Sequence, residues 1–231
     1  MKFLNLALLG CLSSTATFAS NIAPCTEQTL AQYMGAPNCS IGNLVFGELS
    51  YTPTSLGTGV APSAADIMVT PIDQPGDYGL EFSANWVGED AGGSDVAIGY
   101  FVASGSGAAD LGAASLGMVG SASGDSNAIL DEYICPGEEF SSTCANQVHL
   151  HESIGPTGPS GTGPQVPYAS FDPVSSMQLV KDLRVYGVTG TSSVSEISNQ
   201  YPMPEPLTPL LCFSGLVGVW AFRKYRSRSN F

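Results

Sequence analysis

Short apolar runs, separated by clusters of Gly, Pro, Ser and Asp, recur along the middle of the chain. Runs rich in Val, Ile, Tyr and Phe with such boundaries are typical of β-strands. Eight segments have this pattern: 41–51, 67–71, 78–84, 96–104, 128–135, 147–152, 178–187 and 194–200. About eight short strands with frequent turns predict an all-β fold, a single antiparallel β-sandwich or jelly roll.

One helical segment and two loop-like segments interrupt the strand pattern. In segment 26–34, Thr26 can cap the start of a helix and Gly35 can end it, and the apolar side consists of Leu30, Tyr33 and Met34. We expect segment 104–127, rich in Gly, Ala and Ser, to hold loops around one poor strand. Segment 153–167 contains short Gly-Pro repeats and is expected to form a long surface loop.

The N-terminal 19 residues have a targeting pattern. One positive charge precedes a short apolar core, and small and polar residues follow, which is the layout of a secretory signal peptide. Thr17 and Ala19 suit a signal peptidase, so we expect cleavage after Ala19 and an exported domain over residues 20–202. An alternative is a weak lipobox that ends at Cys11, which would then be acylated.

The C-terminal segment 203–231 has three parts. Pro204-Glu205-Pro206 precedes an apolar stretch, 207–222, and a basic end, 223–231, with Arg223, Lys224, Arg226 and Arg228. As a helix, the 16 apolar residues would span about 24 Å, against about 30 Å for the hydrocarbon core of a bilayer. The pattern therefore predicts a short transmembrane helix, with the basic end in the cytoplasm and the preceding domain outside.

This tail resembles the PEP-CTERM sorting signal of Gram-negative bacteria. The resemblance rests on Pro204-Glu205-Pro206, the apolar segment and the terminal basic cluster, although Met203 stands where members of the family usually have Val. It implies an exosortase as partner, and transient attachment to the inner membrane through the C-terminal helix. It further implies delivery to the cell surface or extracellular matrix of an exopolysaccharide-producing, biofilm-forming host. An ordinary single-pass anchor is the alternative.

The charge balance excludes one class of partner. Acidic residues outnumber Lys and Arg by 20 to 7 in the whole chain, giving a net charge of −13. Between residues 21 and 203 only Lys181 and Arg184 are basic, against 19 acids, so the net charge of this part is −17. A nucleic-acid binder is excluded because the residues that neutralise phosphate are missing. An anionic polysaccharide would also be repelled unless divalent cations bridge the two.

Four of the six cysteines lie in the exported domain. Export to an oxidising compartment favours disulfides, and four cysteines allow three connectivities. We favour Cys25–Cys39 and Cys135–Cys144, because each pair is close in sequence and closes a short loop. Zinc on these cysteines is disfavoured, since the chain has no C-x-x-C pair among them.

The two histidines are the first candidates for chemistry. His149 and His151 would share one face of a strand, so both imidazoles could reach one metal ion. Glu152 would point to the other face, which leaves no third ligand nearby in sequence. The chain also has no G-x-S-x-G nucleophile motif. We therefore predict no catalytic residue and no metal-ligand set.

Acidic and aromatic residues offer weaker candidates. The acidic, Gly-rich segment 88–95 could hold a structural calcium ion, although it does not match an EF-hand. Adjacent acids such as Asp131-Glu132 are expected on the solvated surface rather than as the paired carboxyls of a glycosidase. Trp86 and Tyr100 could stack on a sugar ring, but we expect both in the core of the sandwich.

These observations lead to three functional hypotheses. The first is an exported, non-enzymatic protein of the cell surface or extracellular matrix, sorted through its C-terminal tail. The second is a carbohydrate-binding module for the exopolysaccharide of the host, with calcium as a possible aid. The third and least favoured is a glycan-cleaving enzyme.

Overall fold

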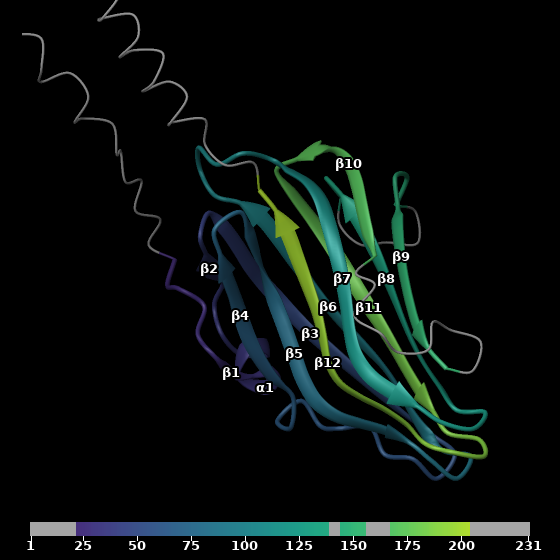
Figure 1. The fold of residues 1–231 in the computed structure, drawn as a ribbon. Coiled ribbons are helices and arrows are strands. Elements are labelled where there is room, and N and C mark those ends of the chain that lie inside the picture. Colours follow the sequence, from purple (N-terminus) through teal and green to yellow (C-terminus); the bar gives the residue numbers. More distant parts are fainter. Residues whose placement is uncertain (1–21, 139–143, 156–166, 204–231) are drawn as a thin grey trace, which may run out of the picture.

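The computed structural model describes residues 22–138, 144–155 and 167–203, which form two six-stranded antiparallel sheets packed face to face (Figure 1). Sheet A has the order β2 (Cys39–Ile41), β3 (Leu44–Leu56), β6 (Gly93–Ser104), β11 (Ser176–Tyr186), β8 (Asn127–Pro136), β9 (Val148–Ile154). Sheet B has the order β1 (Gln28–Thr29), β4 (Met68–Gln74), β5 (Asp77–Gly88), β12 (Ser192–Pro202), β7 (Leu111–Ala122), β10 (Tyr168–Val174).

The connections between the strands follow a jelly roll. Strands β5-β12-β7-β10 of sheet B face strands β6-β11-β8-β9 of sheet A, which is the order of a double Greek key. The predicted all-β, antiparallel sandwich is thus confirmed. The predicted N-terminal signal helix and C-terminal transmembrane helix lie outside the described residues, as do Pro204, Glu205, Pro206 and the basic tail. Within the described ranges, no helix is long and apolar enough to cross a membrane.

The core lies between the two sheets and follows from alternation along the strands. In β11, every second residue from Met177 to Val185 is buried, because successive side chains in a strand point to opposite faces of a sheet. The largest buried side chains include Trp86, Phe46 and Phe82. Trp86 and Tyr100 lie inside the sandwich as expected, so neither is available as a surface platform for sugar.

Strands β7 and β10 differ from the prediction. Segment 104–127 was expected to hold loops around one poor strand, and no strand was expected at 168–174. The Gly/Ala/Ser-rich segment forms a 12-residue strand, β7, that pairs with both β12 and β10. Gly120 in this strand has a steric cause, because a Cβ added there would lie 2.3 Å from the carbonyl oxygen of Ser193 on β12. Strand β10 lies at the edge of sheet B and contains Pro173, which an edge strand tolerates.

The predicted helix is shorter than expected and begins later. Helix α1 covers Leu30–Met34, and its N-cap is Thr29 rather than Thr26. Thr29 and Gln32 form a capping box. The backbone N–H of Gln32 donates to Oγ1 of Thr29, and the backbone N–H of Thr29 donates to Oε1 of Gln32. The residues before the helix extend instead as β1, which pairs with β4. Gly35 ends the helix as predicted.

Both predicted disulfides are present. Cys25–Cys39 ties the N-terminal segment to β2, and Cys135–Cys144 ties β8 to the segment that precedes β9. Their sequence separations are 14 and 9 residues. In the chain-entropy model, a loop of about 15 residues gives about 3 kcal/mol of stabilisation.

Candidate functional site

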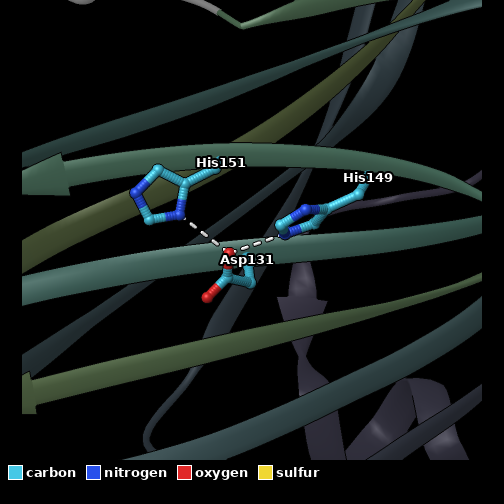
Figure 2. Close-up of side chains that lie close together, drawn as sticks. All are labelled: Asp131, His149 and His151. Carbon is cyan, nitrogen blue, oxygen red and sulfur yellow. Dashed lines mark hydrogen bonds and ion pairs between the residues drawn. The ribbon is translucent and has the colours of Figure 1, made fainter.

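Three side chains with metal-binding groups meet on the outer face of sheet A, near its edge. Asp131 lies on β8, and His149 and His151 lie on the edge strand β9 (Figure 2). The strand register places His151 directly opposite Asp131 and His149 opposite Tyr133. All four residues are at outward-facing positions of the pleat, because their neighbours Leu130, Glu132 and Leu150 are buried.

One carboxylate oxygen joins the two imidazoles. Oδ1 of Asp131 accepts from Nε2 of His149 at 2.7 Å and from Nδ1 of His151 at 2.8 Å. Partial burial would raise the pKa of Asp131, but the hydrogen bonds from the two histidines outweigh it and lower the pKa below its ordinary value. The ring of His149 also stacks on Tyr133, with centroids 4.7 Å apart and planes 5° from parallel. These contacts fix the orientation of the cluster.

The donor set of this cluster fits a first-row transition metal. The three ligand atoms all lie within 4.8 Å of one another, and two ligands of a tetrahedral zinc ion lie about 3.3 Å apart. Two imidazoles and a carboxylate suit Zn²⁺, Ni²⁺ or Cu²⁺, whereas Ca²⁺ prefers oxygen ligands alone. The two histidine side chains are 47% and 52% exposed, so the remaining coordination positions face solvent.

Sequence reasoning found two members of this cluster and missed the third. His149 and His151 share one face, and Glu152 points to the opposite face, as predicted. Asp131 lies 18 residues before His149, so proximity in sequence to the histidines does not reveal it. Asp131 is brought in by the pairing of β8 with β9. The signal was the alternation of the β8 segment, which places Asp131 and Tyr133 on one face.

The acidic segment 88–95 lies elsewhere in the fold. It forms the turn between β5 and β6, with Asp90 and Ala91 in the left-handed region. Among the described residues, the only grouping of three or more metal-binding side chains is Asp131, His149 and His151, so calcium at this turn stays a prediction. Asp95 instead lies beside Asp182 on the outer face, where burial and the neighbouring Asp95 raise the pKa of Asp182 to about 6.

A second polar cluster lies inside the sandwich. Lys181 of β11 and Glu132 of β8 are fully buried and directly opposite in sheet A. Asn199 of β12 reaches them from sheet B, and the hydroxyls of Tyr100 and Tyr201 complete the group. We call these five residues the buried cluster. Glu132 was expected on the solvated surface with Asp131, and this was wrong, because adjacent residues of a strand face opposite sides.

The buried cluster is closely bonded. Nζ of Lys181 donates to Oε2 of Glu132 at 2.9 Å, and Nδ2 of Asn199 donates to Oε1 and Oε2 of Glu132 at 2.8 and 2.6 Å. The hydroxyl of Tyr100 donates to Oδ1 of Asn199 at 2.9 Å and lies 3.0 Å from the hydroxyl of Tyr201. Together these bonds join the two sheets through their centre.

Burial controls the protonation of the cluster and its neighbour. It lowers the pKa of Lys181, although Glu132 and Glu152 oppose the effect, and it raises the pKa values of Tyr100 and Tyr201 well above the ordinary value. Glu152 faces inward from β9, and one of its carboxylate oxygens has no hydrogen-bond partner among the described residues. Burial raises the pKa of Glu152 to about 7. A backbone hydrogen bond from Met118 and the charge of Lys181 lower this pKa, but by less than burial raises it.

Comparisons with known proteins assign no family to the chain. No family model and no curated protein matches the sequence. One solved structure, the module TmCBM61 in complex with β-1,4-galactotriose, matches at 7% identity and a TM-score of 0.31, over 64% of this chain and 86% of the other. A second, which concerns the promiscuous specificity of carbohydrate-binding modules from the β-sandwich superfamily, matches at 9% identity and a TM-score of 0.27, over 75% of this chain and 61% of the other. Likenesses this distant carry no argument about function.

Proposed function

We propose that the protein is an exported, non-enzymatic component of the cell surface or extracellular matrix, sorted through its C-terminal tail. The observation that carries this proposal is the pair of disulfides, Cys25–Cys39 and Cys135–Cys144, which crosslink segments of the sandwich. Structural disulfides persist in oxidising compartments and are rare in the cytosol. Export therefore agrees with the signal-like residues 1–19 that precede this domain.

The tail supports the second half of the proposal. Pro204-Glu205-Pro206, the apolar stretch and the basic end have the order of a PEP-CTERM signal, so the expected partner is an exosortase in the inner membrane. The sandwich joins this tail directly, because the backbone N–H of Met203 still donates to the carbonyl oxygen of Gly76. Processing at the tripeptide would leave the folded domain complete.

The intact mass of the native protein from the cell envelope and the culture fluid tests this proposal. We expect a species that lacks residues 1–19 and the apolar tail. The substitution Glu205→Ala should block processing of the tail, and the matched control Glu89→Ala, an exposed acid of the sandwich, should not. Loss of the N-terminal segment alone in the native protein would overturn sorting in favour of a plain anchor. Retention of both ends would overturn export.

A second candidate function is metal-assisted binding of carbohydrate on the outer face of sheet A. The observation that favours it is the exposed group of Asp131, His149 and His151 beside the ring of Tyr133. A bound divalent cation has open positions that sugar hydroxyl or carboxylate oxygens can fill, and it would offset the repulsion between an acidic domain and an anionic polysaccharide. The aromatic ring beside it provides an apolar surface for a sugar.

Binding of the protein to a panel of purified polysaccharides, with zinc, with calcium and with a chelator, tests this candidate. We expect binding that zinc increases and that the double substitution His149→Ala/His151→Ala removes. The matched control Asp73→Asn changes an exposed acid on β4 of sheet B and should leave binding intact. Binding that is absent under every condition, or that the histidine variant retains, would overturn the candidate.

A further inference from the structure

The buried cluster contains the reactants of a covalent bond. It brings together a primary amine, Lys181, a carboxamide, Asn199, and a carboxyl group, Glu132, all with 0% of their surface exposed. We propose that Nζ of Lys181 and Cγ of Asn199 join in an intramolecular isopeptide bond, formed with the help of Glu132. This inference rests on the interior of the sandwich and does not depend on how the protein is sorted or what it binds.

The geometry brings the two reacting groups to one carboxyl group. Nζ of Lys181 and Nδ2 of Asn199 both lie within hydrogen-bonding distance of Oε2 of Glu132, at 2.9 and 2.6 Å. Lys181 and Glu132 are held opposite each other by the pairing of β11 with β8, and Asn199 by the pairing of β12 with β5 and β7. Groups fixed in this way react with a large effective concentration.

The interior favours the reactive form of the amine. Only a neutral amine is a nucleophile, and removal from water disfavours the charged form of a buried lysine. Its neighbour Glu132 can accept the proton directly through the existing hydrogen bond. Transfer of this proton replaces a buried ion pair by two neutral groups, which cost less to bury.

A hydroxyl group polarises the carboxamide of Asn199 at its oxygen, opposite the nitrogen that contacts Glu132. The hydroxyl of Tyr100 donates to Oδ1 of Asn199, the atom on which negative charge develops when an amine attacks Cγ. The hydroxyl of Tyr201 lies 3.0 Å from that of Tyr100 and can support it by a second hydrogen bond. A preorganised donor at a developing oxyanion, in a site closed to water, is a strong form of transition-state stabilisation.

The proposed step balances without an oxidant or cofactor. The lone pair of Nζ of Lys181 forms a bond to Cγ of Asn199, and the C–N bond to Nδ2 breaks. Glu132 takes a proton from the attacking nitrogen and gives one to Nδ2, which leaves as ammonia. The products are one secondary amide between β11 and β12, one regenerated carboxyl group and a chain lighter by about 17 Da, the mass of ammonia.

Trypsin tests the proposal, because Lys181 and Arg184 are the only cleavage sites between residues 20 and 203. The native protein is reduced, unfolded and digested. With the bond, Lys181 cannot be cleaved, and the fragment that begins at residue 185 stays joined to the fragment that ends at Arg184, about 17 Da below the summed mass. Separate fragments ending at Lys181 and Arg184, with no loss of ammonia, would overturn the proposal.

Variants assign the roles in the same assay. Asn199→Ala and Glu132→Gln should each give separate fragments, whereas the matched controls Asn85→Ala and Glu89→Gln, both exposed, should keep the fragments joined. Fragments that stay joined in Glu132→Gln would overturn the role of Glu132. Fragment sequencing by mass spectrometry locates the bond, and a link at any pair other than Lys181 and Asn199 would also refute the assignment.

Tyr100 is expected to act on the rate. Because its hydroxyl touches the reacting carboxamide, Tyr100→Phe should slow formation of the bond in refolded protein by about 10²-fold, as loss of one oxyanion donor does in enzymes. A time course of joined fragments after refolding measures this rate. An unchanged rate in Tyr100→Phe would refute polarisation by Tyr100, and the matched control Tyr168→Phe, an exposed tyrosine on β10, should react at the native rate.

Discussion

Replacement of Lys181 by an uncharged residue should expose the cost of a buried carboxylate without a cationic partner. Lys181 and Glu132 have no exposed surface, and Nζ of Lys181 lies 2.9 Å from Oε2 of Glu132. At this distance two unit charges attract by about 6 kcal/mol with an effective dielectric constant of about 20. Loss of one partner from such a pair typically costs about 3–5 kcal/mol of stability. We therefore expect Lys181→Met to be less stable, by an amount of this order, than a variant in which Glu132 is also made neutral.

The informative comparison is between Lys181→Met and the double variant Lys181→Met/Glu132→Gln. Neither can form a bond between Lys181 and Asn199, so their difference isolates the charge of Glu132. Glutamine keeps a carbonyl oxygen that can accept from Nδ2 of Asn199. The double variant should therefore be more stable than the single variant by about 3 kcal/mol.

Urea unfolding of the disulfide-bonded protein at pH 7 measures this difference. With a denaturant slope of about 2 kcal/mol per molar urea, the midpoints of the two variants should differ by about 1.5 M. Arg184→Met removes the other basic residue of the domain, which is exposed, and should change stability by no more than about 0.5 kcal/mol. Equal midpoints for the single and double variants would refute the reasoning, because Glu132 would then carry no buried charge, being either protonated or solvated.

Three further outcomes follow from other parts of the structure. Burial raises the pKa of Glu152 from its ordinary 4.5 to about 7, so between these pH values the folded protein binds a proton that the unfolded chain does not, and stability should fall as pH rises. Glu152→Gln should reduce the change of the urea midpoint between about pH 5 and pH 8, and an unchanged pH dependence would contradict this. Replacement of Cys25 and Cys39 together by serine should lower the free energy of unfolding by about 3 kcal/mol, whereas no shift in the urea midpoint would mean that this loop is not a constraint. His151→Ala should weaken zinc binding in calorimetry by at least about tenfold, because one of three protein ligands is lost, and unchanged affinity would place the ion elsewhere.

Alternation along single strands was the part of the fold most open to prediction. The segment around β11 was recognised as an apolar run between turn residues, with an imperfect alternation, and in the structure its Leu179, Leu183 and Val185 share one face with period two. Strand β7 lacks that signal, and at Gly117 and Gly120 close contact with β12 leaves no room for a larger residue. A strand whose side chains are limited by backbone contact resembles a loop in composition, and only the tertiary structure separates the two.

The two clusters needed information that a single strand does not carry. The alternation that buries Leu179 and Leu183 also buries Lys181, and a buried lysine requires a partner. That the partner is Glu132 depends on the register of β8 against β11, and that Asn199 joins them depends on how one sheet packs on the other. The same holds for Asp131, which meets the histidines only through the pairing of β8 with β9.

The position of β12 has a consequence for the newly synthesised chain. This strand is the last of the sandwich in sequence, yet it lies in the middle of sheet B, between β5 and β7. A nascent chain that stops before Ser192 leaves two long strands with open edges, and such edges invite pairing with other chains. The domain can close only after the ribosome has completed nearly all of it. Until then the facing edges of β5 and β7 lack the strand that pairs with both, so a chaperone that covers open strand edges would prevent their pairing with other chains.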